Sequence, residues 1–430
     1  MKLLFKNALV YAPDTVISNA YVAVDGAYIT YVGTARPLGE FDEEKDMSGK
    51  LLMPGLVNCH THTPMTLLRG VGSDLPLQTW LFDKIFPVEG RLTPEMMRIG
   101  TELAMLEMLS TGTTSFSDMY FYPDAMVEAI IKSGMKANIT QHVQSFDAAG
   151  VYADNGQARV MEHLYHTYHG AADGRILVDA CLHAEYTNFS DEVASKVADF
   201  AKAHDLRTQV HLSETLSEHE ECKTRHGGLT PTLWLEKMGM LDVPCTAAHC
   251  VWVTPEDIEV FRAHGVTVAH NPTSNMKLGS GFAPIPEIMD AGVNVALGTD
   301  GTASNNNLNM FEEMHLAAVI HNGYRHDPSL MKAREVVDIA TRRGALAQGR
   351  NDCGMLAPGK KADIIAIDTQ RPHLVPDLDT ASLLTYSVQG SDVVMTMVDG
   401  KVLYENGEYL TLDRERIFAE AEKAVAELYQ

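Results

Sequence analysis

The sequence predicts an α/β protein: a (β/α)8 TIM barrel with a small β-sandwich domain built from both chain termini. Three observations lead to this prediction. The two ends of the chain show short strands joined by hairpin turns, the middle alternates short apolar strands with helical stretches, and polar, ligand-capable residues follow several of the middle strands. The 430 residues, of which 45% are hydrophobic, are sufficient for a sizeable core.

The strands at the two ends are expected to form one domain. They are predicted at 3–11, 20–24 and 28–32 near the N-terminus and at 362–367, 393–398 and 401–404 near the C-terminus. Asp25-Gly26 and Asp399-Gly400 are hairpin turn signals. Because neither set has enough strands to bury a core alone, residues 1–53 and 358–430 are predicted to build one composite β-sandwich, with an amphipathic helix over 414–429.

The middle of the chain, residues 54–357, is predicted to be the barrel and the catalytic domain. Its eight expected strands are 55–60, 113–119, 137–143, 176–182, 208–212, 246–251, 266–270 and 293–299. An open doubly wound sheet is the alternative fold. It is disfavoured because such a sheet concentrates its site at one switch point, whereas here polar residues recur after many strands.

The most informative motif is His60-Thr61-His62 at the end of the first barrel strand. Side chains at positions i and i+2 of a strand leave the same face, so the two imidazoles can converge on one point. His211 ends the fifth strand and His249 ends the sixth, while Asp300 follows the eighth. Each of these residues alone is more often structural. Their coincidence on one rim indicates a metal site.

We predict that His60, His62, His211 and Asp300 are the metal ligands. Three neutral imidazoles and a carboxylate suit one Zn²⁺ per subunit, with a position left for water, although Fe²⁺ or Mn²⁺ fits the same donors. A second metal would need a bridging carboxylate or modified lysine after the fourth strand. That strand ends without a lysine, so one metal is favoured, and Glu185 leaves the two-metal alternative open.

Charge and cysteine content exclude other classes of protein. The formal net charge of -23 repels phosphate backbones and anionic membranes, so we expect neither nucleic acid nor a membrane as partner. The six cysteines show no Cys-x-x-Cys spacing, which argues against a disulfide framework or a thiolate zinc site. With no signal peptide or transmembrane stretch found, we expect a cytoplasmic protein.

Several of these motifs together resemble the amidohydrolase superfamily. They are Pro54-Gly-Leu-Val-Asn-Cys-His-Thr-His62, His211-Leu-Ser-Glu214, His249 and Thr299-Asp300-Gly. The segments His62 to Gly70, Trp80-Leu-Phe and Val88-Glu89-Gly are similar to those of the 5'-methylthioadenosine/S-adenosylhomocysteine deaminases. The resemblance covers nearly the whole chain and implies hydrolytic removal of the amino group from an adenine nucleoside.

The resemblance also implies roles for individual residues. Glu214 would carry protons to the ring and to the leaving amine, and His249 with Asp300 would orient the attacking water. The residues expected to contact substrate are Trp80, Glu89, Arg159, His183, Glu214 and Ser304. Of these, Glu89 would bind the ribose hydroxyls and Arg159 the carboxylate of a homocysteine tail. A departure from the family pattern lies in 145–150, which holds no arginine, so the sequence does not fix which 5'-substituent is preferred.

Three alternatives remain open at this stage. The first is a related aminohydrolase acting on guanine, an oxidised purine, a pterin or an s-triazine. The second is a catalytically silent metal-binding or scaffold protein with the same fold, against which the presence of Glu214 argues. The third is a two-metal phosphoesterase or lactonase. For the assembly, we expect a homo-oligomer.

Overall fold

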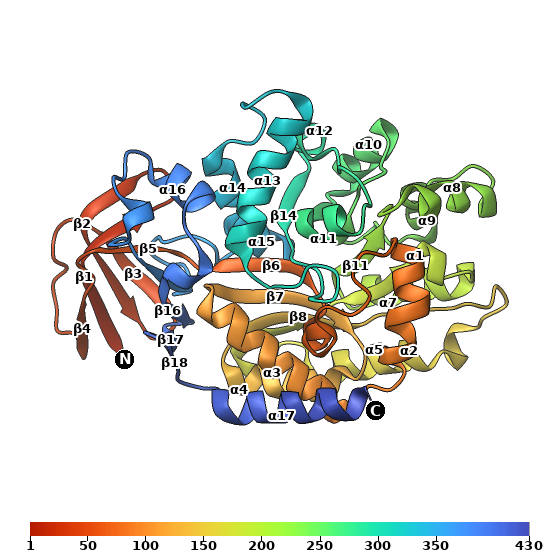
Figure 1. The fold of residues 1–430 in the computed structure, drawn as a ribbon, viewed down its shortest axis with the longest axis horizontal. Coiled ribbons are helices and arrows are strands. Elements are labelled where there is room, and N and C mark those ends of the chain that lie inside the picture. The colour runs from red at the N-terminus through yellow and green to blue at the C-terminus, as the bar shows by residue number, and fades with distance from the viewer. Residues whose placement is uncertain (430) are drawn as a thin grey trace.

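The structure is a computed structural model that describes residues 1–429. Figure 1 shows a sheet on one side, made of red strands from the start of the chain and blue strands from its end. Beside this sheet lie parallel strands surrounded by helices. The first and last parts of the chain are therefore neighbours in space, as predicted.

Nine strands from the two ends of the chain form the terminal sheet. They are β1 (Lys2–Tyr11), β2 (Val16–Asp25), β3 (Tyr28–Gly33), β4 (Glu43–Asp46), β5 (Lys50–Pro54), β15 (Ile364–Asp368), β16 (Val393–Val398), β17 (Lys401–Glu405) and β18 (Glu408–Tyr409). The order is β18-β17-β16-β15-β5-β1-β2-β3, with β4 also paired to β1. This arrangement is consistent with the predicted β-sandwich, and it contains β4, β5 and β18, which the sequence patterns did not reveal.

The two predicted hairpin turns lie against each other. Gly26 and Gly400 both have positive φ angles, of 57° and 74°. A Cβ atom on Gly400 would lie only 1.9 Å from the carbonyl oxygen of Gly26. Glycine at position 400 is therefore required by both its backbone conformation and this close approach. The contact joins the N-terminal and C-terminal halves of the sheet.

The middle of the chain forms two parallel sheets. One has the order β6-β7-β8-β9 and the other β10-β11-β12-β13-β14. Their strands are β6 (Leu56–Thr61), β7 (Thr113–Tyr120), β8 (Lys136–Gln141), β9 (Ile176–Val178), β10 (Ala180–Ala184), β11 (Thr208–Leu212), β12 (Cys245–His249), β13 (Thr267–His270) and β14 (Asn294–Leu297).

Backbone hydrogen bonds join the two parallel sheets at both edges. At one edge the Asp300 N–H donates to the carbonyl of His60 over 2.9 Å, next to β14 and β6. At the other edge the Val143 N–H donates to the carbonyl of Cys181 over 3.0 Å. The mixed α/β class is thus confirmed, and side chains at the carboxyl ends of distant strands are brought to one place.

One predicted strand is divided in the structure. The sequence predicted a single strand over 176–182, but β9 pairs with β8 whereas β10 pairs with β11. The break falls at Asp179, whose carboxylate accepts hydrogen bonds from the side-chain amides of Asn138 and Gln209. The prediction of one strand is corrected to two, because this buried carboxylate is satisfied by groups from both neighbouring strands.

Helices cover the parallel strands. The longer ones are α3 (Pro94–Ser110), α4 (Pro123–Ser133), α5 (Gly156–Tyr168), α7 (Asp191–Ala203), α8 (Leu216–Arg225), α9 (Pro231–Met238), α10 (Pro255–His264), α13 (Met310–Arg325), α14 (Ala333–Ala340) and α17 (Arg414–Leu428). The shorter ones are α1 (Leu77–Trp80), α2 (Phe86–Glu89), α6 (Ala171–Gly174), α11 (Pro272–Lys277), α12 (Ile285–Asp290), α15 (Arg342–Ala347) and α16 (Thr380–Tyr386).

The C-terminal helix lies on the middle part of the chain. Figure 1 shows α17 beside α3, away from the terminal sheet. Arg416 on α17 contacts Glu102 on α3 at 3.1 Å, and Arg98 on α3 contacts Glu420 on α17 at 2.8 Å. The last residues thus tie the end of the chain to α3, the first of the longer helices after the His60-Thr61-His62 motif.

Two further findings concern the whole described chain. All six cysteines are free and buried, which confirms the prediction that they form no disulfide framework. No helix within residues 1–429 is both long enough and apolar enough to cross a bilayer.

Candidate metal centre and active site

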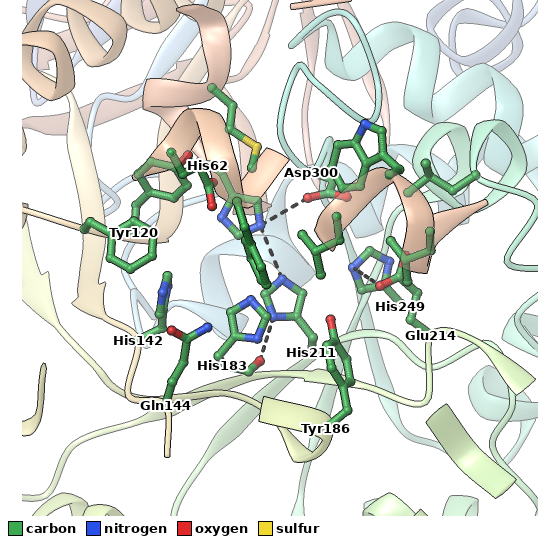
Figure 2. A pocket seen from close by; sticks show the side chains of 18 residues that line it. His62, Tyr120, His142, Gln144, His183, Tyr186, His211, Glu214, His249 and Asp300 are labelled. Atoms are coloured by element: carbon green, nitrogen blue, oxygen red, sulfur yellow. Dashed lines mark hydrogen bonds and ion pairs between the residues drawn. The ribbon is translucent and has the colours of Figure 1, made fainter. Parts of the chain in front are cut away.

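The four predicted ligands converge at the carboxyl ends of the strands, and Figure 2 shows three of them, His62, His211 and Asp300. The Oδ1 atom of Asp300 lies 3.5 Å from Nε2 of His60 and 3.2 Å from Nε2 of His62. The Nε2 atom of His62 lies 3.3 Å from Nε2 of His211. All four residues are buried. The side-chain pairing of His60 and His62 on one face of β6 is confirmed by their ring centroids, which are 4.9 Å apart.

Backbone carbonyls orient two of the imidazole rings. Nδ1 of His62 donates to the carbonyl of Met119 over 2.9 Å, and Nδ1 of His211 donates to the carbonyl of His183 over 2.6 Å. Because a carbonyl only accepts, each Nδ1 carries the hydrogen, and the Nε2 of the neutral ring is left with its lone pair. Both lone pairs face the same point.

Asp300 is held from behind by two hydroxyl groups. Its Oδ2 atom accepts hydrogen bonds from Ser274 at 2.7 Å and from Ser304 at 2.8 Å, so Oδ1 is directed to the histidines. Burial alone would raise the pKa of the Asp300 carboxyl, but the imidazoles of His60 and His62 hold this pKa well below its usual range. The carboxylate is therefore charged.

The electrostatics of the site favour a positive charge at its centre. Burial lowers the pKa of His60 to about 4 and that of His211 well below its usual value, so both rings are neutral. Burial also opposes a charge on His62, but Asp300 outweighs it and raises the pKa of His62 to about 9. The carboxylate thus stabilises a cation at this point, either a proton or a metal ion.

Several donor distances fit a divalent metal ion, and His60 belongs to two groups of close ligand atoms, one with His62 and Asp300 and one with His211 and His249. Zinc bonds of about 2.0–2.1 Å in a tetrahedron place neighbouring donor atoms about 3.4 Å apart. The donor pairs measured here are 3.2 to 3.5 Å apart. In addition, the buried Nε2 of His60 has no hydrogen-bond partner within the described residues. A metal ion would satisfy this nitrogen and take the place of the proton that Asp300 otherwise favours on His62.

Positive φ angles at non-glycine residues cluster around the site. Asp300 has a φ of 61°, His249 of 74° and Ser213 of 46°. Such conformations cost of order 1–3 kcal/mol each and persist where the surrounding structure imposes them. They turn the chain sharply after β11, β12 and β14, so that polar side chains project over the ends of the strands.

Glu214 and His249 lie beside the four ligands. Oε2 of Glu214 is 3.8 Å from Nε2 of His249, and Oε1 of Glu214 accepts a hydrogen bond from Ser280 over 3.3 Å. Nδ1 of His249 is fixed by Oδ1 of Asn275 at 2.9 Å. Burial raises the pKa of the Glu214 carboxyl. A raised pKa favours the protonated form of this carboxyl, from which a proton can be donated.

A cavity of about 50 Å³ opens at this cluster. Of the predicted substrate contacts, Trp80, Glu89, His183 and Glu214 line it. Ser304 is not among the lining residues, because its hydroxyl is engaged by Asp300. Arg159 is exposed on α5, donates to the carbonyl of Ala153 over 2.9 Å and does not line the cavity.

The sequence analysis missed other residues of this cavity. Tyr120, His142, Gln144 and Tyr186 line it (Figure 2). Tyr120 donates its hydroxyl hydrogen to Glu89, and both ring nitrogens of buried His142 are without a partner among residues 1–429. Tyr120 ends β7, and His142 directly follows β8. The rule that identified His211 and Asp300, polar residues at strand ends, would have found them too.

Glu185, the residue that left a second metal open, is bound elsewhere. Its Oε2 contacts Arg225 at 2.5 Å and its Oε1 contacts His226 at 2.8 Å. This carboxylate is therefore neutralised by cationic and imidazole groups on and after α8. Glu185, Cys222 and His226 are close enough to hold an ion, but the Arg225 guanidinium already occupies the carboxylate. The arrangement favours one metal at the four-residue cluster.

Comparisons with known proteins agree with this geometry. Residues 51–403 match the model of the amidohydrolase family. The chain is 42% identical over 431 residues to a 5-methylthioadenosine/S-adenosylhomocysteine deaminase from Caldanaerobacter subterraneus subsp. tengcongensis, covering 100% of this chain and 99% of that protein. It is also 42% identical over 431 residues to a 5'-deoxyadenosine deaminase from Methanosarcina acetivorans, covering 96% and 98%.

Solved structures show the same similarity. An adenosine deaminase from Xanthomonas campestris with bound zinc superimposes with a TM-score of 0.93 and 32% identity, covering 99% of this chain and 98% of that one. A zinc-complexed atrazine chlorohydrolase from Arthrobacter aurescens gives a TM-score of 0.91 and 26% identity, covering 98% and 100%. Since the family model matches most of the chain and relatives align over its full length, this protein belongs to the amidohydrolase family.

Proposed function

We propose that this protein is a metal-dependent deaminase that hydrolyses the 6-amino group of an adenine nucleoside to give the inosine analogue and ammonia. The substrates we consider are S-adenosylhomocysteine, 5'-methylthioadenosine and adenosine. The single observation that carries the proposal is Glu214, a buried carboxyl that faces His249 next to the cluster of His60, His62, His211 and Asp300. Relatives named as nucleoside deaminases support the substrate class.

We further propose that the two parallel sheets form one (β/α)8 barrel over residues 54–357 and that 1–53 and 358–430 form the composite β-sandwich domain. The hydrogen bonds at both sheet edges support the closed barrel. One zinc ion per subunit is favoured because zinc is bound in the Xanthomonas and Arthrobacter neighbours. Fe²⁺ or Mn²⁺ would suit the same donors. A cytoplasmic homo-oligomer completes the proposal.

The metal would be held by His60, His62, His211 and Asp300, and when bound it lowers the pKa of a coordinated water to about 7. His249 and Asp300 orient the attacking water by hydrogen bonds and stabilise the charge that develops. Glu214 donates a proton to the ring nitrogen beside the reacting carbon. It then takes one proton from the water and passes it to the amine, the carbon–nitrogen bond breaks to release ammonia, and the second proton of the water returns to Glu214 as the carbonyl forms. Trp80, Glu89 and His183 bind the nucleoside.

Steady-state deamination kinetics on a substrate panel test the proposal. The panel contains adenosine, 5'-methylthioadenosine and S-adenosylhomocysteine, together with guanine, an oxidised purine, a pterin and an s-triazine. We expect loss of the adenine ultraviolet absorbance and release of ammonia with the nucleosides only. Turnover of guanine, the oxidised purine, the pterin or the s-triazine, without turnover of any nucleoside, would favour a related aminohydrolase. Protein that holds one equivalent of metal but turns over no member of the panel would favour the scaffold alternative. Two equivalents of metal per chain would favour the two-metal hydrolase.

A further inference from the structure

A second chamber continues outward from the cavity at the metal cluster. Its volume is about 520 Å³, and it shares Phe86, Glu89, Phe121 and Gln144 with the inner cavity. The inner cavity, of about 50 Å³, is well below the roughly 300–1,000 Å³ of small-molecule sites. A nucleoside with its base at the histidines must therefore extend into the outer chamber.

The wall of the outer chamber is largely aromatic. Besides Phe86 and Phe121 it contains Tyr122 and Phe146, whose side chains are 49% and 56% exposed. Large exposed aromatic side chains at the mouth of a cavity are the surface that an apolar ligand group would cover. This wall suits an alkyl or thioether group.

The lining of the two cavities contains no lysine or arginine from residues 1–429. Two carboxyls line the outer chamber: Glu89, whose pKa is raised by burial, and Asp124, which pairs with His163 at 2.9 Å. The guanidinium of Arg159 donates to the carbonyl of Ala153 next to Gly156 and does not line the chamber. A carboxylate on the ligand would therefore leave water without a cationic partner in the lining, which is unfavourable.

Gln144 lines both cavities and therefore lies at their junction; Figure 2 shows its side chain at the inner cavity. Its backbone N–H donates to Oε1 of Gln157 over 2.8 Å, and its carbonyl accepts from Nδ2 of Asn155 over 2.8 Å. Its side-chain Oε1 accepts from Nε2 of Gln157 over 3.3 Å. The backbone is thus fixed, and an uncharged amide stands where the 5'-substituent would pass.

We propose that the outer chamber selects nucleosides with an uncharged 5'-substituent, a hydrogen or a small thioether, over those with a carboxylate there, and that Gln144 sets this preference. The inference rests on the proposed function. It replaces the role expected of Arg159 with a chamber that has no cation for the homocysteine carboxylate.

The test compares kcat/KM for 5'-deoxyadenosine, 5'-methylthioadenosine and S-adenosylhomocysteine in one preparation. We expect S-adenosylhomocysteine to be at least about tenfold poorer than 5'-methylthioadenosine. The variant Gln144→Arg should raise the ratio of S-adenosylhomocysteine to 5'-methylthioadenosine by about tenfold or more, with the gain weakened by added salt. Gln144→Met, which is similar in length and uncharged, should leave this ratio within about threefold of the original. Because a ratio is measured, partial unfolding of a variant does not affect it.

Two outcomes overturn the inference. In one, the wild type has similar kcat/KM values for S-adenosylhomocysteine and 5'-methylthioadenosine, and Arg159→Gln removes only the activity on S-adenosylhomocysteine. The other is equal changes of the ratio in Gln144→Arg and Gln144→Met, since charge would then not be the cause. Both leave nucleoside deamination intact, whereas failure of the proposed function itself would show as no turnover of any nucleoside.

Discussion

His62 and His211 face each other with their Nε2 atoms 3.3 Å apart, and each ring turns its Nδ1 to a backbone carbonyl on a neighbouring strand. The two carbonyls belong to Met119 on β7 and His183 on β10. The strands therefore fix not only the positions of the ligands but also which nitrogen carries the hydrogen. This orientation prepares the site for a cation without movement of the rings.

Replacing one ligand should remove the metal. We expect His211→Gln to reduce metal content from one equivalent per chain to a small fraction of it, with loss of activity and a lower melting temperature, because a bound ion stabilises the native state. Elemental analysis and thermal unfolding measure this. His163→Gln is the matched control, since His163 is exposed and its ring nitrogens contact Asp124 and Thr167, neither of which is a predicted ligand. Full metal content in the His211 variant would contradict the ligand set.

Glu214→Gln should separate metal binding from turnover. Glutamine has the size of glutamate but cannot accept and return a proton, so we expect the metal to remain and kcat to fall by about a hundredfold or more. Glu220→Gln, on the exposed side of α8, controls for a nearby loss of charge. Retained activity in the Glu214 variant with a full equivalent of metal would refute its role in proton transfer.

Much of the fold and of the metal cluster was predictable because strand ends carry a strong signal. His60, His62, His211 and Asp300 each follow a short apolar run, and parallel strands bring their carboxyl ends to one edge. Side-chain direction was not predictable. Ser304 donates to Asp300, four residues before it, and Arg159 to the carbonyl of Ala153, six residues before it, and a residue pattern does not show such local hydrogen bonds. The break at Asp179 was hidden because its partners, Asn138 and Gln209, are distant in the chain.

Trp80 should act through its ring face. Its indole N–H already donates to the carbonyl of Val71 over 3.1 Å, so the side chain offers the cavity an aromatic surface and no free donor. We expect Trp80→Phe to change kcat/KM by less than about threefold. Trp80→Ala should lower it by about fivefold to a hundredfold, as expected when about 1–3 kcal/mol of stacking on a base is lost. Equal losses in both variants would instead assign the effect to the Val71 hydrogen bond.

Lys136 should be important for stability. Its side chain is 3% exposed at the start of β8, and Nζ contacts Asp363 at 2.5 Å and Asp399 at 2.7 Å, both in the C-terminal part of the chain. Lys136→Met would leave the buried Asp363 carboxylate without its cation, at a cost of about 3–5 kcal/mol, while Asp399 would keep Lys361 at 3.5 Å. Denaturant unfolding measures this, with Lys196→Met as the exposed control. A loss no larger than the control's would show that the buried pair is not needed.

The same ion pair gives a pH dependence whose sign follows from two pKa shifts. Burial would raise the pKa of Asp363, but Lys136 outweighs burial and holds it below its usual value; burial would lower the pKa of Lys136, but Asp363 and its neighbours raise it. The ionised Asp363 carboxylate thus stabilises the folded state at pH values above about 3.9, which is its pKa in the unfolded chain. This stabilisation is lost as the pH falls through the lower pKa that the group has in the folded state. The Lys136 ammonium stabilises the folded state below about pH 10.4, which is its pKa in the unfolded chain. This stabilisation is lost as the pH rises through the higher pKa that the group has in the folded state.

The difference in unfolding free energy between wild type and Lys136→Met should therefore be large near pH 7 and shrink as the pH is lowered from about 5 toward 3. Urea titrations at several pH values measure it, and a difference that stays constant over that range would place the stabilisation in packing of the lysine stem instead of in its charge.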